Sequence, residues 1–106
     1  MFAGLAVRDY PSARVWYERL FGRPPDMLPH EREAVWRLTD TASVYVVADP
    51  ARAGTGLLTV AVDDFDELLA GLAARGLAPR IEMVGDGVRK AVVGDPDGNE
   101  IAFFAA

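Results

Sequence analysis

The sequence contains an internal repeat. Residues 5–10 (Leu-Ala-Val-Arg-Asp-Tyr) lead into an amphipathic stretch that ends at residues 21–25. About 55 residues later, residues 60–65 (Val-Ala-Val-Asp-Asp-Phe) lead into a second amphipathic stretch, which ends at residues 75–79. A repeat of this period predicts two supersecondary units that build one body with a shared surface between them. We therefore expect the functional site on the surface that the two units share.

Composition limits the class of protein. The chain has 106 residues, of which 51% are hydrophobic and 25% charged, and this predicts one globular domain. Cysteine is absent and His30 is the single histidine, so thiolate sites and sites that need two imidazoles from one chain are excluded. The net charge of −5 argues against nucleic-acid binding, which needs a basic face. No apolar run reaches the length of a signal peptide or a membrane span, so we expect a cytoplasmic protein without a membrane partner.

The first half of the chain predicts a strand, a helix and three further strands. Residues 2–7 are an apolar strand, and Asp9 can cap a helix that Gly22 ends. Four apolar positions of this helix share one face: Ala13, Trp16, Tyr17 and Leu20. The three following strands are expected at 26–29, 33–38 and 43–48.

The second half repeats this order. Residues 50–56, rich in glycine and with Pro50, are the expected linker, and residues 57–62 are the next strand. Asp64 and Glu67 resemble a capping box at the start of the second helix. Strands are then expected at 80–84, 88–93 and 100–105. The predicted fold is α+β, with one module at about 1–49 and the other at about 57–106, each in the order β-α-β-β-β. Each helix covers one face of its sheet, and the opposite faces enclose a cleft in which a small molecule can bind.

Residues 95–101 (Asp-Pro-Asp-Gly-Asn-Glu-Ile) are typical of a tight turn between two strands. Together with the repeated module, this turn resembles the vicinal oxygen chelate superfamily, which contains glyoxalase I, bleomycin-resistance proteins, fosfomycin-resistance enzymes and extradiol dioxygenases. The segments that carry the resemblance are 4–9, 16–22, 60–65 and 95–103. The resemblance implies two βαβββ modules that form cupped mixed sheets around a shared cleft.

The same resemblance implies four metal-ligand positions, one on the first and one on the last strand of each module. Enzymes of the superfamily place His, Gln or Glu there, whereas this chain has Phe2, Tyr45, Leu57 and Ala102. Phe, Leu and Ala cannot coordinate a metal, and a lone Tyr is not a metal site. A shift of one residue would add only Glu100. We therefore expect neither a metal nor another cofactor.

Strand alternation, together with the superfamily pattern, directs one set of side chains into the cleft. The candidate ligand-binding residues are Phe2, Trp36, Tyr45, Leu57, Thr59, Arg89, Ala102 and Phe104. Two of them have alternative interpretations. Trp36 either packs in the core or forms a stacking platform for a ligand, and Arg89 is either solvated or points into the cleft.

These observations favour a metal-free small-molecule binding protein of the bleomycin-resistance type, which sequesters an apolar or aromatic ligand in the cleft between the modules. A homodimer is expected from the resemblance and because such small sheets leave edges that a partner usually covers. Whether the modules pair within one chain or between chains stays open.

Two other functions remain possible on the sequence. One is a glyoxalase-like lyase, isomerase or dioxygenase that uses a displaced metal or acid–base residues such as Glu82, Glu100 and Arg89. The other is a degenerate module with a dry cleft that acts only in dimerisation or regulation. The sequence therefore leaves open whether the chain is an enzyme.

Overall fold

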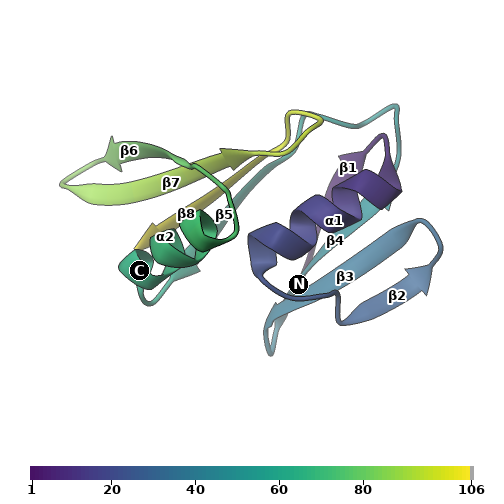
Figure 1. The fold of residues 1–106 in the computed structure, drawn as a ribbon, viewed down its shortest axis with the longest axis horizontal. Helices are drawn as coiled ribbons and strands as arrows, with labels where there is room; N and C mark the ends of the chain where they lie inside the picture. The colour runs from purple at the N-terminus through teal and green to yellow at the C-terminus, as the bar shows by residue number, and fades with distance from the viewer. Residues whose placement is uncertain (106) are drawn as a thin grey trace.

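The computed structural model describes residues 1–105 and contains two modules of the same order (Figure 1). The first module comprises β1 (Phe2–Val7), α1 (Tyr10–Phe21), β2 (Met27–His30), β3 (Glu33–Thr39) and β4 (Ala42–Ala48). The second comprises β5 (Leu57–Val62), α2 (Phe65–Ala74), β6 (Arg80–Val84), β7 (Val88–Gly94) and β8 (Glu100–Ala105). The predicted α+β fold with two βαβββ modules is confirmed. Neither helix within the described residues is long and apolar enough to cross a membrane.

Each module forms its own four-stranded mixed sheet. The strand orders are β1-β4-β3-β2 and β5-β8-β7-β6. In each sheet the first strand runs parallel to the last one, and the other neighbours are antiparallel. Because a parallel pair needs a crossover connection, the helix after the first strand must pass over one face of the sheet. The other face of each sheet is left without a helix.

The helices begin where the sequence predicts. The Asp9 carboxylate accepts a hydrogen bond from the backbone N–H of Ser12, and the Asp64 carboxylate accepts one from the N–H of Glu67. Gly22 ends α1 with a left-handed φ of 75°, a conformation in which a Cβ atom would be strained. Local residue choice therefore determines both helix starts and the end of α1.

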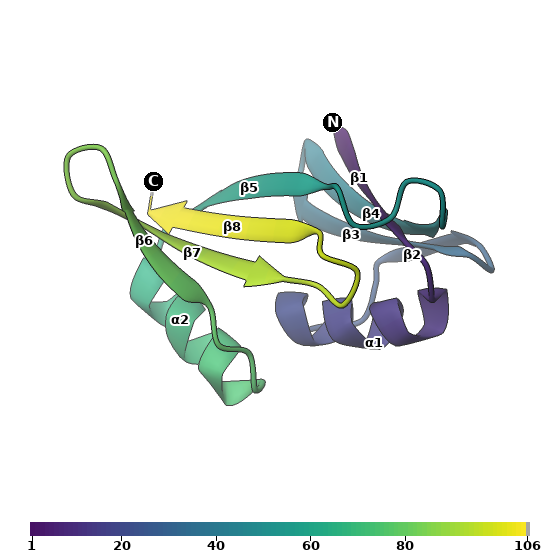
Figure 2. The same cartoon turned by 90° about the horizontal axis from the view of Figure 1, so that it is seen from above.

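One hydrophobic core extends through both modules. Tyr17, Leu20 and Trp36 of the first module belong to the same buried cluster as Leu72 and Ile101 of the second. This is possible because α1 and α2 lie on the same side of the two sheets, next to each other (Figures 1 and 2). The burial of apolar surface therefore holds the modules together as well as each module by itself.

The two helices also cap each other. The Arg19 guanidinium donates to the carbonyl oxygen of Arg75 at 3.0 Å and to that of Gly76 at 3.2 Å. The Arg75 guanidinium in turn donates to the carbonyl oxygens of Arg19 and Leu20. Carbonyl groups at a helix C-terminus lack partners within their own helix and carry partial negative charge, so a cation from the neighbouring helix satisfies them. This reciprocal contact fixes how the C-termini of α1 and α2 meet.

The turn between β7 and β8 forms a second junction between the modules. Asn99 is fully buried, and its side-chain amide donates to the carbonyl oxygen of Ala6 on β1 at 2.8 Å. The Tyr17 hydroxyl of α1 donates to the Asp95 carboxylate at 2.7 Å. The same carboxylate accepts hydrogen bonds from the backbone N–H groups of Asp97 and Asn99. The sequence predicts the turn, and the structure shows that the turn also binds the other module.

Candidate ligand-binding faces

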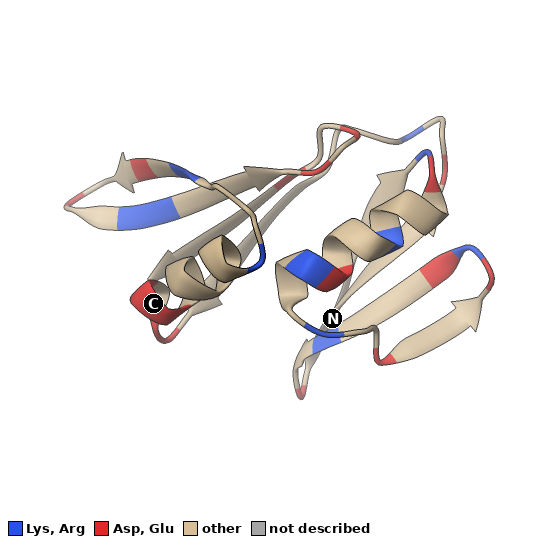
Figure 3. Ribbon diagram, in the orientation of Figure 1, with Lys and Arg blue, Asp and Glu red and all other residues tan. Residues whose placement is uncertain are grey.

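The side of each sheet that carries no helix is the candidate site. In the first module we call this side open face 1. It includes Phe2, Gly4, Ala6, Ser43, Tyr45 and Val47. In the second module, open face 2 includes Leu57, Thr59, Ala61, Glu100, Ala102 and Phe104. Among β1, β4, β5 and β8, which supply these residues, only β8 carries a charged residue, Glu100 (Figure 3).

Tyr45 is one of two aromatic residues on open face 1, with Phe2. It lies directly opposite Gly4 in the register of β1 and β4, and its ring occupies the space above that glycine. A Cβ atom at position 4 would lie 2.3 Å from Cζ of Tyr45 and 2.5 Å from its hydroxyl oxygen, which no real contact allows. The absence of a side chain at Gly4 therefore lets the Tyr45 ring lie across the strand.

Five other candidates also lie on the open faces. Phe2 is 65% exposed and Leu57 is 82% exposed, both unusually high for large apolar residues in a strand. Thr59 is exposed, Phe104 is half-buried and Ala102 is buried. These five residues therefore lie on the side of the sheets that strand alternation predicts.

Trp36 is a core residue. It lies opposite Val44 on the helix-facing side of the first sheet and is fully buried. Its ring centroid lies 5.4 Å from that of Phe21 and 6.3 Å from that of Tyr17, and its indole N–H donates to the carbonyl oxygen of Arg23 at 3.0 Å. The interpretation of Trp36 as a ligand platform is therefore wrong, because its strand position directs it to α1.

Arg89 also points to the helix side. Its guanidinium carbon lies 4.8 Å from the centroid of the Phe65 ring, and it forms an ion pair with Asp66 of α2 at 3.1 Å. The neighbouring Lys90 is the residue that pairs with Phe104 and shares the side of open face 2. Arg89 therefore does not point into the cleft. The other interpretation of this residue, a solvated position on the surface, is confirmed.

The residues proposed for acid–base chemistry do not form a cluster. Glu82 pairs with Lys90 in the row that contains Phe104, whereas Glu100 pairs with Leu57 in the row at the other end of the strands. Arg80 donates to the Glu82 carboxylate at 2.7 Å, and this contact raises the pKa of Arg80. With Arg89 on the opposite side of the sheet, these three residues are not assembled into one site.

The donor groups present do not fit a divalent metal. Of the four positions implied by the resemblance, only Tyr45 has an oxygen, and no group of three or more His, Cys, Asp or Glu residues able to hold a metal occurs within residues 1–105. Both nitrogens of His30 face protein partners: Nδ1 accepts from the N–H of Arg32 at 3.2 Å, and Nε2 lies 3.2 Å from the Glu33 carboxylate.

The most perturbed ionisable group is structural. Burial is the main reason why the pKa of the Tyr17 phenol lies far above its ordinary value, and the hydrogen bond to the Asp95 carboxylate raises it further. The phenol therefore stays protonated and donates to Asp95. This pair connects the modules and lies away from both open faces.

Two small pockets lie near the open faces. The first, about 200 Å³, is lined by residues of both modules that lie on both sides of their strands, and we call it the seam pocket; its lining residues include Ala3, Ser43, Val44, Thr59, Val60 and Ala61. The second, about 210 Å³, lies beside the 49–56 segment, and we call it the linker pocket; it is lined by Gly4, Ala6, Tyr45, Val47, Asp49, Arg52, Thr55 and Gly56. Neither pocket is lined by Phe2, Leu57 or Ala102. A single chain therefore does not bring the predicted residues together around either pocket.

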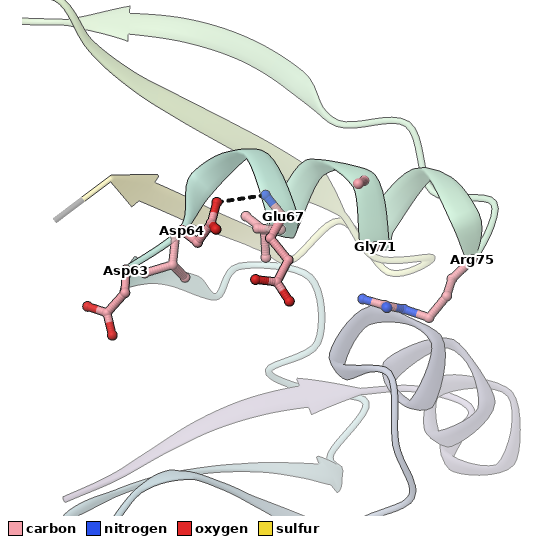
Figure 4. A pocket seen from close by; sticks show the side chains of 8 residues that line it. Asp63, Asp64, Glu67, Gly71 and Arg75 are labelled. Atoms are coloured by element: carbon pink, nitrogen blue, oxygen red, sulfur yellow. Dashed lines mark hydrogen bonds between the residues drawn. The ribbon is translucent and has the colours of Figure 1, made fainter.

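A wider groove of about 660 Å³ runs along α2 (Figure 4). Asp63 and Glu67 lie toward one end of it and Arg75 at the other, where its guanidinium reaches toward α1. The Asp64 carboxylate caps α2 and Arg75 caps α1, so these two groups already serve the helix ends. The groove contains none of the candidate ligand-binding residues.

Three polar residues of the linker pocket are not among the candidates that the sequence predicts: Asp49, Arg52 and Thr55. Asp49 ends the predicted first module, and Arg52 and Thr55 lie in the predicted linker. A usable signal was present, because Asp49 and Arg52 are opposite charges three residues apart in an otherwise glycine-rich loop, and loops held by a rigid scaffold often carry binding residues.

Comparison with known proteins agrees with the fold. The profile of the Glyoxalase/Bleomycin resistance protein/Dioxygenase superfamily matches residues 2–103. The chain belongs to this superfamily, as its resemblance to the vicinal oxygen chelate proteins predicts. No curated protein matches the chain significantly.

Several solved structures share the architecture. A glyoxalase/bleomycin resistance protein from Catenulispora acidiphila is 43% identical, with a TM-score of 0.95 over 100% of this chain and 96% of that one. An antibiotic-binding protein from a Streptomyces species is 26% identical, with a TM-score of 0.74 over 98% of this chain and 92% of that one. A bleomycin-binding protein in complex with bleomycin is 23% identical, with a TM-score of 0.75 over 100% of this chain and 97% of that one.

Proposed function

We propose that this chain is a small-molecule binding protein that holds a flat apolar or aromatic ligand against its open faces and uses no metal. The observation that carries the proposal is the Tyr45 ring, which lies across Gly4 at a position where enzymes of the superfamily place a metal ligand. This aromatic ring lies between β1 and β4, which carry no charged residue, and it offers dispersion contact and stacking to another ring but no coordination. The antibiotic-binding and bleomycin-binding relatives support binding as the activity.

The proposed binding unit is a homodimer. Within one chain Phe2 and Leu57 are largely exposed and line neither the seam pocket nor the linker pocket. A second copy that places its open face 2 against open face 1 would cover both residues and enclose a ligand between them. Such an arrangement follows a two-fold axis and gives two equivalent sites. We place the dimer in the cytoplasm, where a sequestering protein of this kind would act on ligands inside the cell.

Tyr45→Ala tests the proposal. Removing the ring should weaken binding of an aromatic ligand about tenfold, because the stacking surface and its buried area are lost. Tyr45→Phe should bind nearly as well as the unchanged protein, since the ring is kept. Isothermal titration with aromatic compounds selected by a thermal-shift screen gives the dissociation constants.

Phe21→Leu is a matched control, since it changes an aromatic residue on the helix side and should leave affinity unchanged. Equal affinities for Tyr45→Ala and the unchanged protein would contradict a site on open face 1. Light scattering across a concentration series tests the dimer independently, and a monomer at all concentrations with intact ligand binding would contradict the shared site.

A further inference from the structure

The segment between the modules supplies half of the residues that line the linker pocket. Tyr45 and Val47 of β4 and Gly4 and Ala6 of β1 supply the others. We infer that this pocket is a subsite that selects ligands by a neutral hydrogen-bonding substituent, a primary amide or a hydroxyl group, on the aromatic body that stacks on Tyr45. The inference rests on the proposed function, since it assigns part of the same ligand to a second set of residues.

The pocket is continuous with open face 1. Tyr45 belongs to both, with its ring across Gly4, and the phenol oxygen lies above β1. Among residues 1–105 no protein group forms a hydrogen bond with this hydroxyl. A ligand that stacks on the ring can therefore reach the pocket with a substituent while its body stays on the open face.

The loop that carries the pocket residues is held at both ends. The N–H of Asp49 donates to the carbonyl oxygen of Val7 at 3.0 Å, and the N–H of Gly56 donates to the side-chain oxygen of the buried Asn99 at 2.7 Å. Gly54 has a left-handed φ of 91°, and a Cβ there would lie 2.4 Å from the carbonyl oxygen of Asp97. The loop is thus fitted against the β7–β8 turn, and a fixed loop loses little conformational entropy when a ligand binds.

The polar groups of the pocket are available. Arg52 and Asp49 form an ion pair in which Nε lies 3.7 Å from the carboxylate, a separation beyond hydrogen-bond distance, and the Arg52 side chain is 84% exposed. The Thr55 hydroxyl donates to the carbonyl oxygen of Arg52, which leaves the Thr55 oxygen free to accept. The pocket therefore offers a carboxylate acceptor, a guanidinium donor and two hydroxyl oxygens.

This combination favours a neutral substituent. A ligand carboxylate would gain from Arg52 but face Asp49, and a ligand ammonium would gain from Asp49 but face Arg52. A primary amide can donate to the Asp49 carboxylate and accept from the Arg52 guanidinium at the same time. A hydroxyl group can do the same with one oxygen. Because Asp49 and Arg52 do not saturate each other, such a substituent completes their hydrogen bonding.

A series of probes on one ring system tests the inference. 2-Naphthamide, 2-naphthoate, 2-naphthylmethylammonium and 2-acetylnaphthalene share the same flat body and differ in the charge and donor capacity of the substituent. Proton–nitrogen correlation NMR of the full chain gives a dissociation constant for each and shows which amides move. We expect 2-naphthamide to bind about tenfold more tightly than the other three, with shifts in residues 49–56.

Two variants remove the pocket groups one at a time. Asp49→Asn and Arg52→Ala should each reduce the preference for 2-naphthamide, and Arg52→Ala should bring 2-naphthamide close to 2-acetylnaphthalene in affinity. Arg14→Ala is the matched control, since it removes the same charge from α1 on the helix side and should leave the preference unchanged.

The possible results separate the two proposals. Equal binding of all four probes, a preference for a charged probe, or an unchanged preference in both pocket variants would overturn the subsite while leaving the aromatic binding site intact. Failure of every probe to bind, with amide shifts absent around Tyr45, would contradict the proposed function and with it the subsite.

Discussion

The two modules have the same strand order and pair their first and last strands in the same way, yet their open faces differ at equivalent positions. In the first module Gly4 lies opposite Tyr45, so a small residue on the first strand makes room for a ring from the last. In the second module Thr59 lies opposite Ala102, and neither side chain is large. At these equivalent positions, open face 1 therefore presents an aromatic ring, whereas open face 2 leaves space. The difference shows how a duplicated scaffold can provide both a stacking platform and the room opposite it, if two copies of the chain meet face to face.

We expect the largest loss of stability from a substitution in the β7–β8 turn, where the second module contacts α1 of the first. Asp95→Ala removes the acceptor of the Tyr17 hydroxyl and of two backbone N–H groups, all in a buried turn. Leaving buried donors unpaired should lower the free energy of unfolding by about 3 kcal/mol. Asp97→Ala in the same turn loses an ion pair with the exposed Arg8 guanidinium and a hydrogen bond from the Arg8 backbone N–H, and it should cost about 1 kcal/mol. Urea denaturation measures both, and similar values for the two variants would show that Asp95 is not a main link between the modules.

The next largest loss of stability is expected from a substitution on open face 1. Gly4→Ala places a methyl group where the Tyr45 ring lies, so the ring must move, at a cost of about 2 kcal/mol. Gly94→Ala in the second module introduces the same methyl group where no other atom lies within 4 Å, and it should leave stability unchanged or slightly raised. Thermal denaturation compares the two variants. A tolerated Gly4→Ala with unchanged aromatic-ligand affinity would show that the ring position is not important.

A smaller effect is expected from pH. Tyr17, a buried residue of α1, is ionisable and lies beside the Asp95 carboxylate, whereas Leu72, a buried residue of α2, has no ionisable group. Because the pKa of Tyr17 is raised in the folded chain, its contribution to stability is complete below the ordinary tyrosine pKa of about 10 and is lost as pH rises above that value.

At pH 11 this loss should amount to about 1 kcal/mol, and Tyr17→Phe should remove it. Unfolding curves between pH 8 and pH 11 for both proteins measure the difference. Parallel pH profiles would contradict a buried neutral phenol at the junction.

No effect is expected from metals. Phe2 and Tyr45 in the first module and Leu57 and Ala102 in the second stand at the positions where the resemblance implies metal ligands, and the donor atoms of neither pair suit a divalent ion. Adding Mn, Zn, Ni or Fe should leave the melting temperature within error, whereas an aromatic ligand should raise it. A metal-dependent rise that Tyr45→Phe abolishes would show that the phenol oxygen is a ligand after all.

The elements of the fold could be predicted because each follows from local residue choice. Asp9 and Asp64 start the helices, Gly22 ends the first, and the apolar alternation identifies the strands. The direction of a side chain on an inner strand was harder to predict. Trp36 and Arg89 are candidates for the cleft because of their chemistry, and the sequence leaves their direction open, whereas strand register places both on the helix side. A shift of one residue reverses the direction of every side chain in a strand, and neither strand shows a clear enough alternation to exclude it.

The sequence by itself determined the duplicated βαβββ order. It also determined which side chains stand at positions 2, 45, 57 and 102, and these side chains do not suit a metal. These properties depend on periodicity and on donor chemistry, both of which are local. Only the tertiary structure decided that α1 and α2 cap each other, that the β7–β8 turn binds the first module through Asn99, and that the 49–56 segment forms a pocket with Tyr45. Each of these depends on groups far apart in the chain, and their meeting follows from how the two modules pack on one core.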